Sequence, residues 1–252
     1  MKAVIIIPAR LASTRLSEKL LQKVGGKTIL QHTYERARQS KKASRVIIAA
    51  DDERIRAAAC AFGGEVVMTN RAHRSGTERV AEAARDVDAD IVVNVQGDEP
   101  EMEPEHIDRL ISAQAKYGPF ASTLVCPFPS TASVDNPARV KAVLGPRLRS
   151  SSEHNPVFNA IFFTRAPAPF PRDGSLTCVD HFLHIGIYAF KKQTLLAFAR
   201  MREGINERIE KLEQLRIVEE RKRIIAVLVD HGAPGIDTPD DLAAFRARFE
   251  KR

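Results

Sequence analysis

The sequence predicts an α/β fold with a mostly parallel sheet and helices on both of its faces. Four runs in the first half are continuously apolar, as strands buried on both faces are. These runs are Ala3–Ile7, Val46–Ala50, Glu65–Met68 and Asp90–Val95. Helical patterns separate them at Thr28–Gln39, Asp52–Phe62 and Thr77–Arg85. Regular alternation of strand and helix is typical of a parallel sheet with crossover helices.

In such a sheet, ligands bind beyond the carboxyl ends of the strands. Each of the four predicted strands is followed by a segment with polar or charged residues. We therefore expect a binding site built from Pro8–Lys19, Asp51–Asp52, Thr69–Gly76 and Gln96–Pro100.

The second half is less regular. It contains five further strand candidates, at Ala121–Pro127, Arg139–Leu144, Asn159–Thr164, His184–Phe190 and Ile224–Val229. Helices are predicted at Lys192–Met201 and Glu207–Glu220 and from Pro239, where Thr238 is a good N-cap. No linker and no internal repeat divides the chain, so we expect a single domain over residues 1–252.

The net charge of +7 is compatible with nucleic acid, an anionic membrane or small anionic substrates. The basic residues are spread among acidic ones, and the densest run, Glu219–Arg223, mixes both signs and indicates a solvated helix end. The chain has no Trp and only 3 Tyr, which disfavours a platform for stacking bases. We expect small anionic substrates and no nucleic-acid partner.

The cysteines and the apolar segments bear on the compartment. Cys60, Cys126 and Cys178 are far apart and form no metal-ligand pair, as suits reduced thiols in a cytoplasm. The apolar run Val4–Ile7 is too short for the core of a signal peptide. No stretch approaches the roughly 20 apolar residues that span a bilayer. A cytoplasmic location without membrane insertion is predicted.

The segment Pro8–Lys19 has the chemistry of a triphosphate site. It follows the first strand and carries three cations, Arg10, Arg15 and Lys19. A polyphosphate needs backbone amides, arginines for bidentate contacts and a lysine as a point charge. Composition alone would equally allow an ordinary surface loop, but the position directly after the first strand favours phosphate binding.

Several segments, in order along the chain, resemble the 3-deoxy-manno-octulosonate cytidylyltransferases, the enzymes that make CMP-Kdo. The first is the pattern PARxxSTRL…K of Pro8–Lys19. The others are His73–Arg79, Asn94–Pro100, Asn136–Pro137, His184–Tyr188, Glu213–Arg216 and Gly235–Leu242. The resemblance covers nearly the whole chain. It implies one Rossmann-like nucleotidyltransferase domain, with a smaller sugar-binding and dimerisation subregion at about residues 120–190.

The resemblance also implies the reaction. Members of the family transfer CMP from CTP to the anomeric hydroxyl of 3-deoxy-D-manno-octulosonate (Kdo), giving CMP-Kdo and pyrophosphate for lipopolysaccharide biosynthesis, and they are commonly homodimers. Two alternatives stay open. One is the same chemistry on 8-amino-Kdo or sialic acid, and the other is a noncatalytic nucleotide-binding protein.

The residues that match the family's functional positions fall into three groups. Asp98 and Asp237 match the carboxylates that hold Mg²⁺, an ion that prefers oxygen ligands. With Arg10, Arg15 and Lys19 they form the expected catalytic set. The expected CTP contacts are Pro8, Ala9, Arg10, Arg15, Lys19, Ser75, Gly76, Arg79 and Gln96. The expected contacts with the sugar acid are Gln96, Arg165, His184, Tyr188, Glu210 and Gln214.

Structural roles compete with several of these assignments. Asp98 and Asp237 also suit a turn and a helix cap, and Ser75–Gly76 suits a plain helix start with Thr77 as N-cap. Glu210 and Gln214 are four residues apart on a predicted helix, and the face they share could be a solvated stripe. His184 could be a core histidine.

The chain departs from the family pattern at one place in the triphosphate loop. Where the family usually has Arg-Leu-Pro-Gly-Lys, this chain has Arg15-Leu16-Ser17-Glu18-Lys19. The loss of Pro and Gly changes the stiffness of the loop and its permitted backbone angles. Glu18 also places a negative charge beside the expected phosphates.

Overall fold

The computed structural model describes residues 1–13, 15–128, 134–170, 172–173 and 181–251, so Thr14 and Cys178 lie outside the described residues. The chain divides into two compact units. The first comprises Met1–Asp108 and Ala233–Arg252, and the second comprises Arg109–Gly232. The expectation of a single domain over 1–252 stays a prediction.

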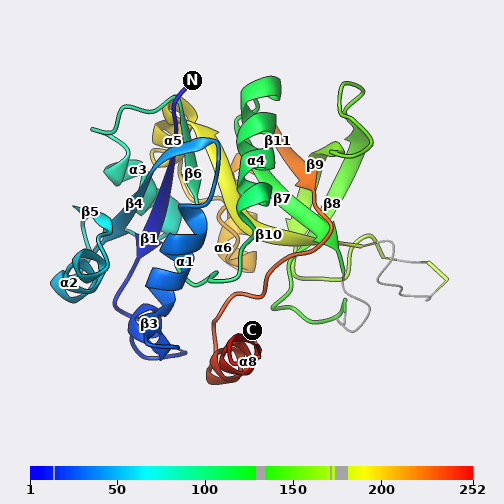
Figure 1. The fold of residues 1–252 in the computed structure, drawn as a ribbon. Coiled ribbons are helices and arrows are strands. Elements are labelled where there is room, and N and C mark those ends of the chain that lie inside the picture. Colours follow the sequence, from blue (N-terminus) through cyan, green and yellow to red (C-terminus); the bar gives the residue numbers. More distant parts are fainter. Residues whose placement is uncertain (14, 129–133, 171, 174–180, 252) are drawn as a thin grey trace. The chain divides into compact units, whose positions relative to one another are not determined.

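Four parallel strands form the sheet of the first unit, in the order β5-β4-β1-β6 (Figure 1). They are β1 (Ala3–Ala9), β4 (Ala43–Ala50), β5 (Glu65–Met68) and β6 (Ile91–Asn94). Strand β1 pairs in parallel with both β4 and β6, and all of its residues are buried. The continuous apolar runs thus predicted the parallel strands correctly. Strand β5 was expected to be buried, and this is wrong. It pairs with β4 at the end of the strand order, and Met68 is 40% exposed.

The helices of the first unit begin at short polar caps. They are α1 (Ile29–Ala37), α2 (Glu53–Ala61), α3 (Gly76–Ala83) and α8 (Pro239–Phe249), and they accompany a 3-10 turn, η1 (Lys19–Leu21), and a ribbon of β2 (Lys23–Val24) and β3 (Lys27–Thr28). The expectation that Thr77 caps α3 is wrong. The cap is Ser75, whose hydroxyl accepts from the backbone N–H of Glu78, and Thr77 is buried and accepts from the side chain of Asn94.

The sheet of the second unit is mixed. Its strands are β7 (Ala121–Pro127), β8 (Lys141–Arg147), β9 (Val157–Thr164), β10 (Phe182–Lys191) and β11 (Ile224–Leu228), in the order β10-β7-β11-β9-β8. Strands β7 and β11 are parallel, while β10–β7, β11–β9 and β8–β9 are antiparallel. Strand β8 also pairs with β10, at Lys141 and Leu183. All five strands predicted in this half are confirmed.

The helical segments of the second unit correct one prediction. They are α5 (Lys192–Phe198), α6 (Ile205–Glu210) and α7 (Leu215–Glu219), and α4 (Pro104–Tyr117) runs from the first unit into the second. The single helix expected at Glu207–Glu220 is wrong, because Lys211 adopts a left-handed conformation (φ 54°) and ends α6. Glu210 and Gln214 therefore do not share a helix face. The exposed residues 220–223 confirm a solvated end after α7.

Candidate active site

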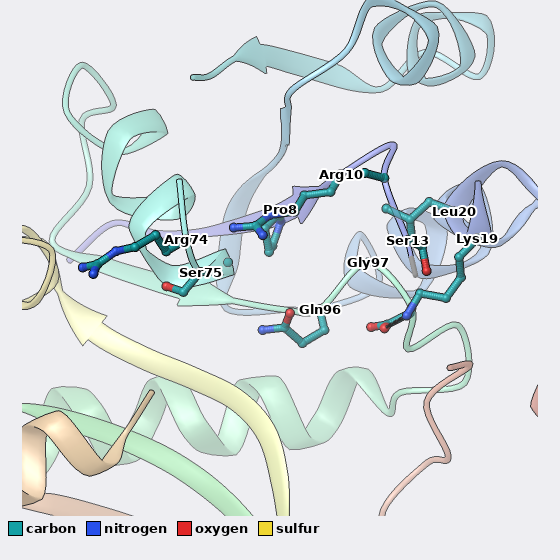
Figure 2. Close-up of a pocket in the computed structure, with 12 residues that line it drawn as sticks. Pro8, Arg10, Ser13, Lys19, Leu20, Arg74, Ser75, Gln96 and Gly97 are labelled. Carbon is teal, nitrogen blue, oxygen red and sulfur yellow. Dashed lines mark hydrogen bonds and ion pairs between the residues drawn. The ribbon is translucent and has the colours of Figure 1, made fainter. Parts of the chain in front are cut away.

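A cavity of about 250 Å³ opens at the carboxyl edge of the parallel strands in the first unit. Figure 2 shows Gln96 between Ser75 on one side and Lys19 on the other. Seven of the predicted residues line this cavity: Pro8, Arg10, Lys19, Ser75, Gly76, Gln96 and Asp98. Five other lining residues were not named individually, and all but Leu20 lie within the segments expected to build the site: Ala12, Ser13, Leu20, Arg74 and Gly97. Ser13 and Arg74 carry polar groups within the segments expected to build the site, so the sequence could have indicated them as binding residues.

Gly76, in the first turn of α3, lies close to Pro8 of β1. A Cβ atom at this position would lie 3.2 Å from Pro8 Cγ and 3.4 Å from Gln96 Oε1. A side chain at residue 76 would therefore press on two residues that line the cavity. The requirement for glycine comes from this close approach of backbone to a binding surface.

Lys19 joins the two predicted metal carboxylates. Its ammonium contacts the Asp98 carboxylate and lies 2.9 Å from Asp237 Oδ1. Arg15 Nη2 lies 3.1 Å from the other oxygen of Asp237. Burial lowers the pKa of Lys19, but the two carboxylates outweigh this effect and the net shift is upward. Lys19 is therefore a permanently charged group at neutral pH.

The side chain of Asp237 is not used to cap α8. The capping box of this helix consists of Thr238 and Asp241. One carboxylate oxygen of Asp241 accepts from the backbone N–H groups of both Asp237 and Thr238. The Asp237 carboxylate is thereby directed to Arg15 and Lys19.

The donor set at this place fits Mg²⁺. Asp98 and Asp237 come from distant parts of the chain, and their carboxylates reach the same ammonium. Glu99, the residue after Asp98, responds to the charges of the two aspartates. Although it keeps some accessible surface, burial together with the charges of Asp98 and Asp237 raises the pKa of its carboxyl group to about 8. Converging carboxylates with a negative local field are the hard oxygen ligands that Mg²⁺ prefers.

Arg79 lies beneath the loop rather than in the lining of the cavity. Its guanidinium is fully buried, with Nη1 at 2.6 Å from Thr69 Oγ1 and Nη2 at 3.2 Å from Asp51 Oδ2. The other oxygen of Asp51 accepts from the backbone N–H of Leu11 at 3.0 Å. Arg79 thus holds Asp51, which in turn holds the backbone of the triphosphate loop. Direct contact between Arg79 and a nucleotide stays a prediction.

The remaining predicted residues of the loop take separate places. Arg10 donates from Nη2 to the backbone carbonyl of His73 at 2.6 Å, which ties the loop to the segment before α3. Ala9 is the last residue of β1. Arg15 does not line the cavity, but its guanidinium contacts the Asp237 carboxylate.

In the second unit, two predicted sugar-binding residues contact each other. The backbone N–H of Arg165 donates to Glu210 Oε2 at 2.7 Å, and its Nε donates to the backbone carbonyl of Glu210 at 2.7 Å. Thr164 donates to the other carboxylate oxygen at 2.6 Å. These bonds fix the end of α6 against the end of β9.

The other three predicted sugar-binding residues of this unit form a second group. Tyr188 donates its hydroxyl to Gln214 Oε1 at 2.9 Å, and the rings of His184 and Tyr188 lie 5.5 Å apart. Gln214 is 2% exposed, and its Nε2 has no hydrogen-bond partner within the described part of the chain. A buried amide donor of this kind points to a ligand or a water molecule. Phe163, 4.8 Å from the His184 ring, is the neighbour of Thr164 and so links the two groups.

Thr123, which was not predicted, contacts the His184 ring beside a β-bulge in β10. The register between β10 and β7 shifts between Ile185 and Tyr188. The Thr123 hydroxyl lies 2.9 Å from the Ile187 carbonyl, 3.2 Å from the Ile185 carbonyl and 2.8 Å from His184 Nε2. The hydroxyl has one hydrogen, and it donates this hydrogen to a carbonyl, because carbonyls only accept. In its contact with His184 the hydroxyl is then the acceptor, so Nε2 carries the ring proton. Burial lowers the pKa of His184 to about 3, so its Nδ1 is an acceptor at neutral pH.

Lys141 was also not predicted. It is fully buried on β8 and donates from Nζ to the carbonyls of Asn136 and Arg165, at 2.9 and 2.7 Å. Burial lowers the pKa of its ammonium group. Lys141 thereby joins the Asn136–Pro137 segment to Arg165. A lysine within a strand is usually assigned to the surface, so its sequence context gave no signal.

Comparisons with known proteins bear on the family and the fold of the chain. Residues 4–224 match the family model for cytidylyltransferases. The chain is 45% identical to the 3-deoxy-manno-octulosonate cytidylyltransferase of Rhodopirellula baltica and 41% identical to that of Chlorobaculum tepidum. These alignments cover 100% of this chain and 100% and 99% of those proteins.

Solved structures give the same result for the fold. The fold superposes with a TM-score of 0.90 and 36% identity on a CMP:2-keto-3-deoxy-manno-octonic acid synthetase in complex with CTP, covering 100% of this chain and 99% of that one. A 4-diphosphocytidyl-2C-methyl-D-erythritol synthase from Anaerococcus prevotii is 13% identical with a TM-score of 0.61, covering 99% and 98%, and shares the fold alone. The predicted Rossmann-like nucleotidyltransferase fold is confirmed.

Proposed function

The chain belongs to the 3-deoxy-manno-octulosonate cytidylyltransferase family, and from this premise we propose that it transfers CMP from CTP to the anomeric hydroxyl of Kdo. The products are CMP-Kdo, an activated sugar for lipopolysaccharide biosynthesis, and pyrophosphate. The observation that carries the proposal is the contact of Lys19 with both Asp98 and Asp237 beside the cavity of the first unit.

The triphosphate of CTP binds to the cations of the loop. Arg10, Arg15 and Lys19 hold the β- and γ-phosphates and stabilise the charge that develops on the leaving pyrophosphate. Lys19 and Arg15 contact carboxylates in this structure, so phosphate oxygens would join or replace these partners. No covalent intermediate is required, and catalysis consists of alignment and neutralisation of charge.

We assign Mg²⁺ to Asp98 and Asp237. When bound there, the ion supplies neutralisation of charge at the α-phosphate and activation of the attacking oxygen. The carboxylates hold the ion, and Lys19 contributes a fixed positive charge beside them. Support for this assignment comes from the convergence of the two aspartates and from Glu99, whose pKa is raised to about 8 by burial and, in addition, by the charges of Asp98 and Asp237.

The cytosine ring and the sugar acid are assigned to different residues. Ser75, Gly76 and Gln96 line the cavity at the base end, where backbone groups and the side-chain amide can read a pyrimidine edge. Kdo presents a carboxylate and several hydroxyls. Their proposed partners in the second unit are Arg165, His184, Tyr188, Glu210 and Gln214, and the buried Nε2 of Gln214 is the observation that favours this assignment.

Three further properties belong to the same proposal. The enzyme acts in the cytoplasm, where its substrate CTP is available, and it works as a homodimer of single-domain chains. Among the described residues, no helix is both long and apolar enough to cross a membrane. Light scattering of the purified protein tests the homodimer.

A panel of sugar acids tests the function. Release of pyrophosphate is measured with CTP, Mg²⁺ and either Kdo, 8-amino-Kdo or sialic acid. The proposal predicts the highest kcat/KM with Kdo. A clear preference for one of the other acids would assign a different acceptor, and binding of CTP without turnover on any acid would indicate a noncatalytic nucleotide-binding protein.

A further inference from the structure

Glu18 has an unusual backbone conformation for its residue type. Its φ and ψ are 47° and 38°, in the left-handed region that glycine adopts readily and glutamate rarely does. The residue precedes Lys19, and its carbonyl accepts from the backbone N–H of Leu21 at 2.8 Å. The left-handed conformation therefore starts the 3-10 turn that carries Lys19. It also explains why the resembled family pattern has glycine at this position.

Arg54 holds the Glu18 side chain from the first turn of α2. Its Nη1 lies 2.5 Å from Oε1 and its Nη2 lies 2.6 Å from Oε2. The backbone N–H of Arg54 donates to the capping carboxylate of Asp52 at 2.9 Å. A bidentate pair fixes the orientation of a carboxylate as well as its charge. The side chain of Glu18 is thus anchored to a helix with a defined cap.

Adjacent side chains in this loop are directed to different partners. Lys19 contacts Asp98 and Asp237, whereas Glu18 contacts Arg54. Arg54 neutralises the Glu18 carboxylate and keeps it away from the partners of Lys19. Without that pair, a mobile negative charge would lie one residue from a proposed phosphate ligand.

We propose that Arg54 is a positioning residue for CTP binding, which holds Glu18 in the left-handed conformation and prevents its charge from opposing the triphosphate. The proposal rests on the proposed function, because that function identifies the bound triphosphate as CTP. It assigns a role to a residue outside the loop and outside the lining of the cavity. It also accounts for the presence of glutamate at a position that favours glycine.

A surface ion pair without functional consequence is the competing interpretation. The side chains of Arg54 and Glu18 are 57% and 38% exposed, and pairs of this kind contribute little to stability. The two interpretations differ in one respect. If Arg54 acts through Glu18, its removal affects CTP only while Glu18 is present.

The test is a double-mutant cycle with Arg54→Ala, Glu18→Gly and the double variant. Arg56→Ala is the matched control, since Arg56 lies on the same helix and pairs with Glu53 at 2.9 Å. We expect Arg54→Ala to raise KM for CTP about fivefold, as one partly screened charge does, while kcat changes by less than about twofold. Glu18→Gly and the double variant should both stay near the wild-type KM.

Binding of CTP with Mg²⁺, measured by calorimetry, separates this inference from the proposed function. If the wild type shows no turnover but Arg54→Ala still weakens CTP binding only in the presence of Glu18, the reaction is wrong and the positioning role stands. An equal loss from Arg54→Ala in the Glu18→Gly background would overturn the role of Arg54. So would an Arg54→Ala variant that behaves like Arg56→Ala.

Discussion

The Lys19 ammonium lies 2.9 Å from Asp237 Oδ1 and also contacts the carboxylate of Asp98. One side chain of the triphosphate loop thus joins the two carboxylates assigned to the metal. Local sequence does not bring these residues together, since η1, the segment after β6 and the segment before α8 supply one each. The relationship places the loop and the two carboxylates at one site.

Replacing either aspartate should abolish most of the activity without unfolding the protein. Asp98→Asn and Asp237→Asn each keep the size of the side chain but remove the charge that binds Mg²⁺ and faces Lys19. We expect kcat to fall by about tenfold or more in each variant, with a higher Mg²⁺ concentration at half-maximal rate. Steady-state kinetics under Mg²⁺ titration measure both effects.

Asp240→Asn is the matched control for these variants. Asp240 is an exposed residue in the first turn of α8. It should retain wild-type kinetics, and circular dichroism should show folded protein in all three cases. A folded Asp98→Asn or Asp237→Asn enzyme with near-normal turnover would remove that carboxylate from the metal role.

A methyl group at residue 76 should weaken nucleotide binding while sparing the fold. In Gly76→Ala the new Cβ would lie 3.2 Å from Pro8 Cγ, which must shift slightly, and 3.4 Å from Gln96 Oε1, at van der Waals contact. Forcing one extra carbon into a filled space costs about 1–3 kcal/mol, which predicts an increase of about fivefold or more in the KM for CTP. Urea unfolding checks stability. Unchanged CTP binding would show that this contact does not shape the base site.

The Thr123 hydroxyl should determine which nitrogen of His184 carries the proton. In Thr123→Val the ring loses its acceptor and the bulge carbonyls lose a donor, which we expect to cost about 1–3 kcal/mol of stability and to raise the KM for Kdo. Thr123→Ser keeps the hydroxyl and should behave like the wild type. Nitrogen-15 NMR of the ring should show a protonated Nε2 in the wild type. A protonated Nδ1 in that spectrum would refute the assignment.

His184 should also make stability depend on pH. Its pKa in the folded protein is about 3, below the value near 6.5 expected in the unfolded chain, because burial disfavours the charged ring. Unfolded chains therefore bind protons more readily between these limits. The His184 contribution is fully present above pH 6.5 and is lost on acidification, by up to about 1.4 kcal/mol per pH unit.

Comparison with His184→Gln isolates this contribution from the titration of carboxylates. Urea unfolding of both proteins at pH 7.5, 6.5 and 5.5 gives the difference in free energy. That difference should fall by about 0.4 kcal/mol between pH 7.5 and 6.5, where the unfolded ring becomes half protonated, and by about 1 kcal/mol more at pH 5.5. Parallel curves over the whole range would show that the ring is not buried in its neutral form.

Local patterns were sufficient to predict the strands. Continuous apolar runs gave β1, β4 and β6, because both faces of these strands are covered, and the apolar and β-prone runs of the second half gave β7 and β11. Helix ends were harder to predict. Lys211 takes a left-handed conformation that no Gly or Pro marks, and both Ser75 and Thr77 are good caps, so sequence alone could not choose between them.

The predicted site residues came from loops whose chemistry is visible in the sequence. Residues that act through distant partners were missed. Lys141 is buried because the carbonyls of Asn136 and Arg165 accept its hydrogens, and Thr123 is buried beneath a bulge of another strand. For Arg54, the decisive partner is 36 residues away. Such pairings depend on tertiary structure, which periodicity does not encode.

Phosphorus-31 NMR of the purified protein with CTP, Mg²⁺ and Kdo tests the central claim most directly, because it observes which phosphorus–oxygen bond breaks. Transfer of CMP to the anomeric hydroxyl predicts equal growth of a CMP diester signal and of pyrophosphate, with loss of the three CTP signals. Formation of CDP and orthophosphate, or persistence of CTP beside bound Kdo, would contradict it.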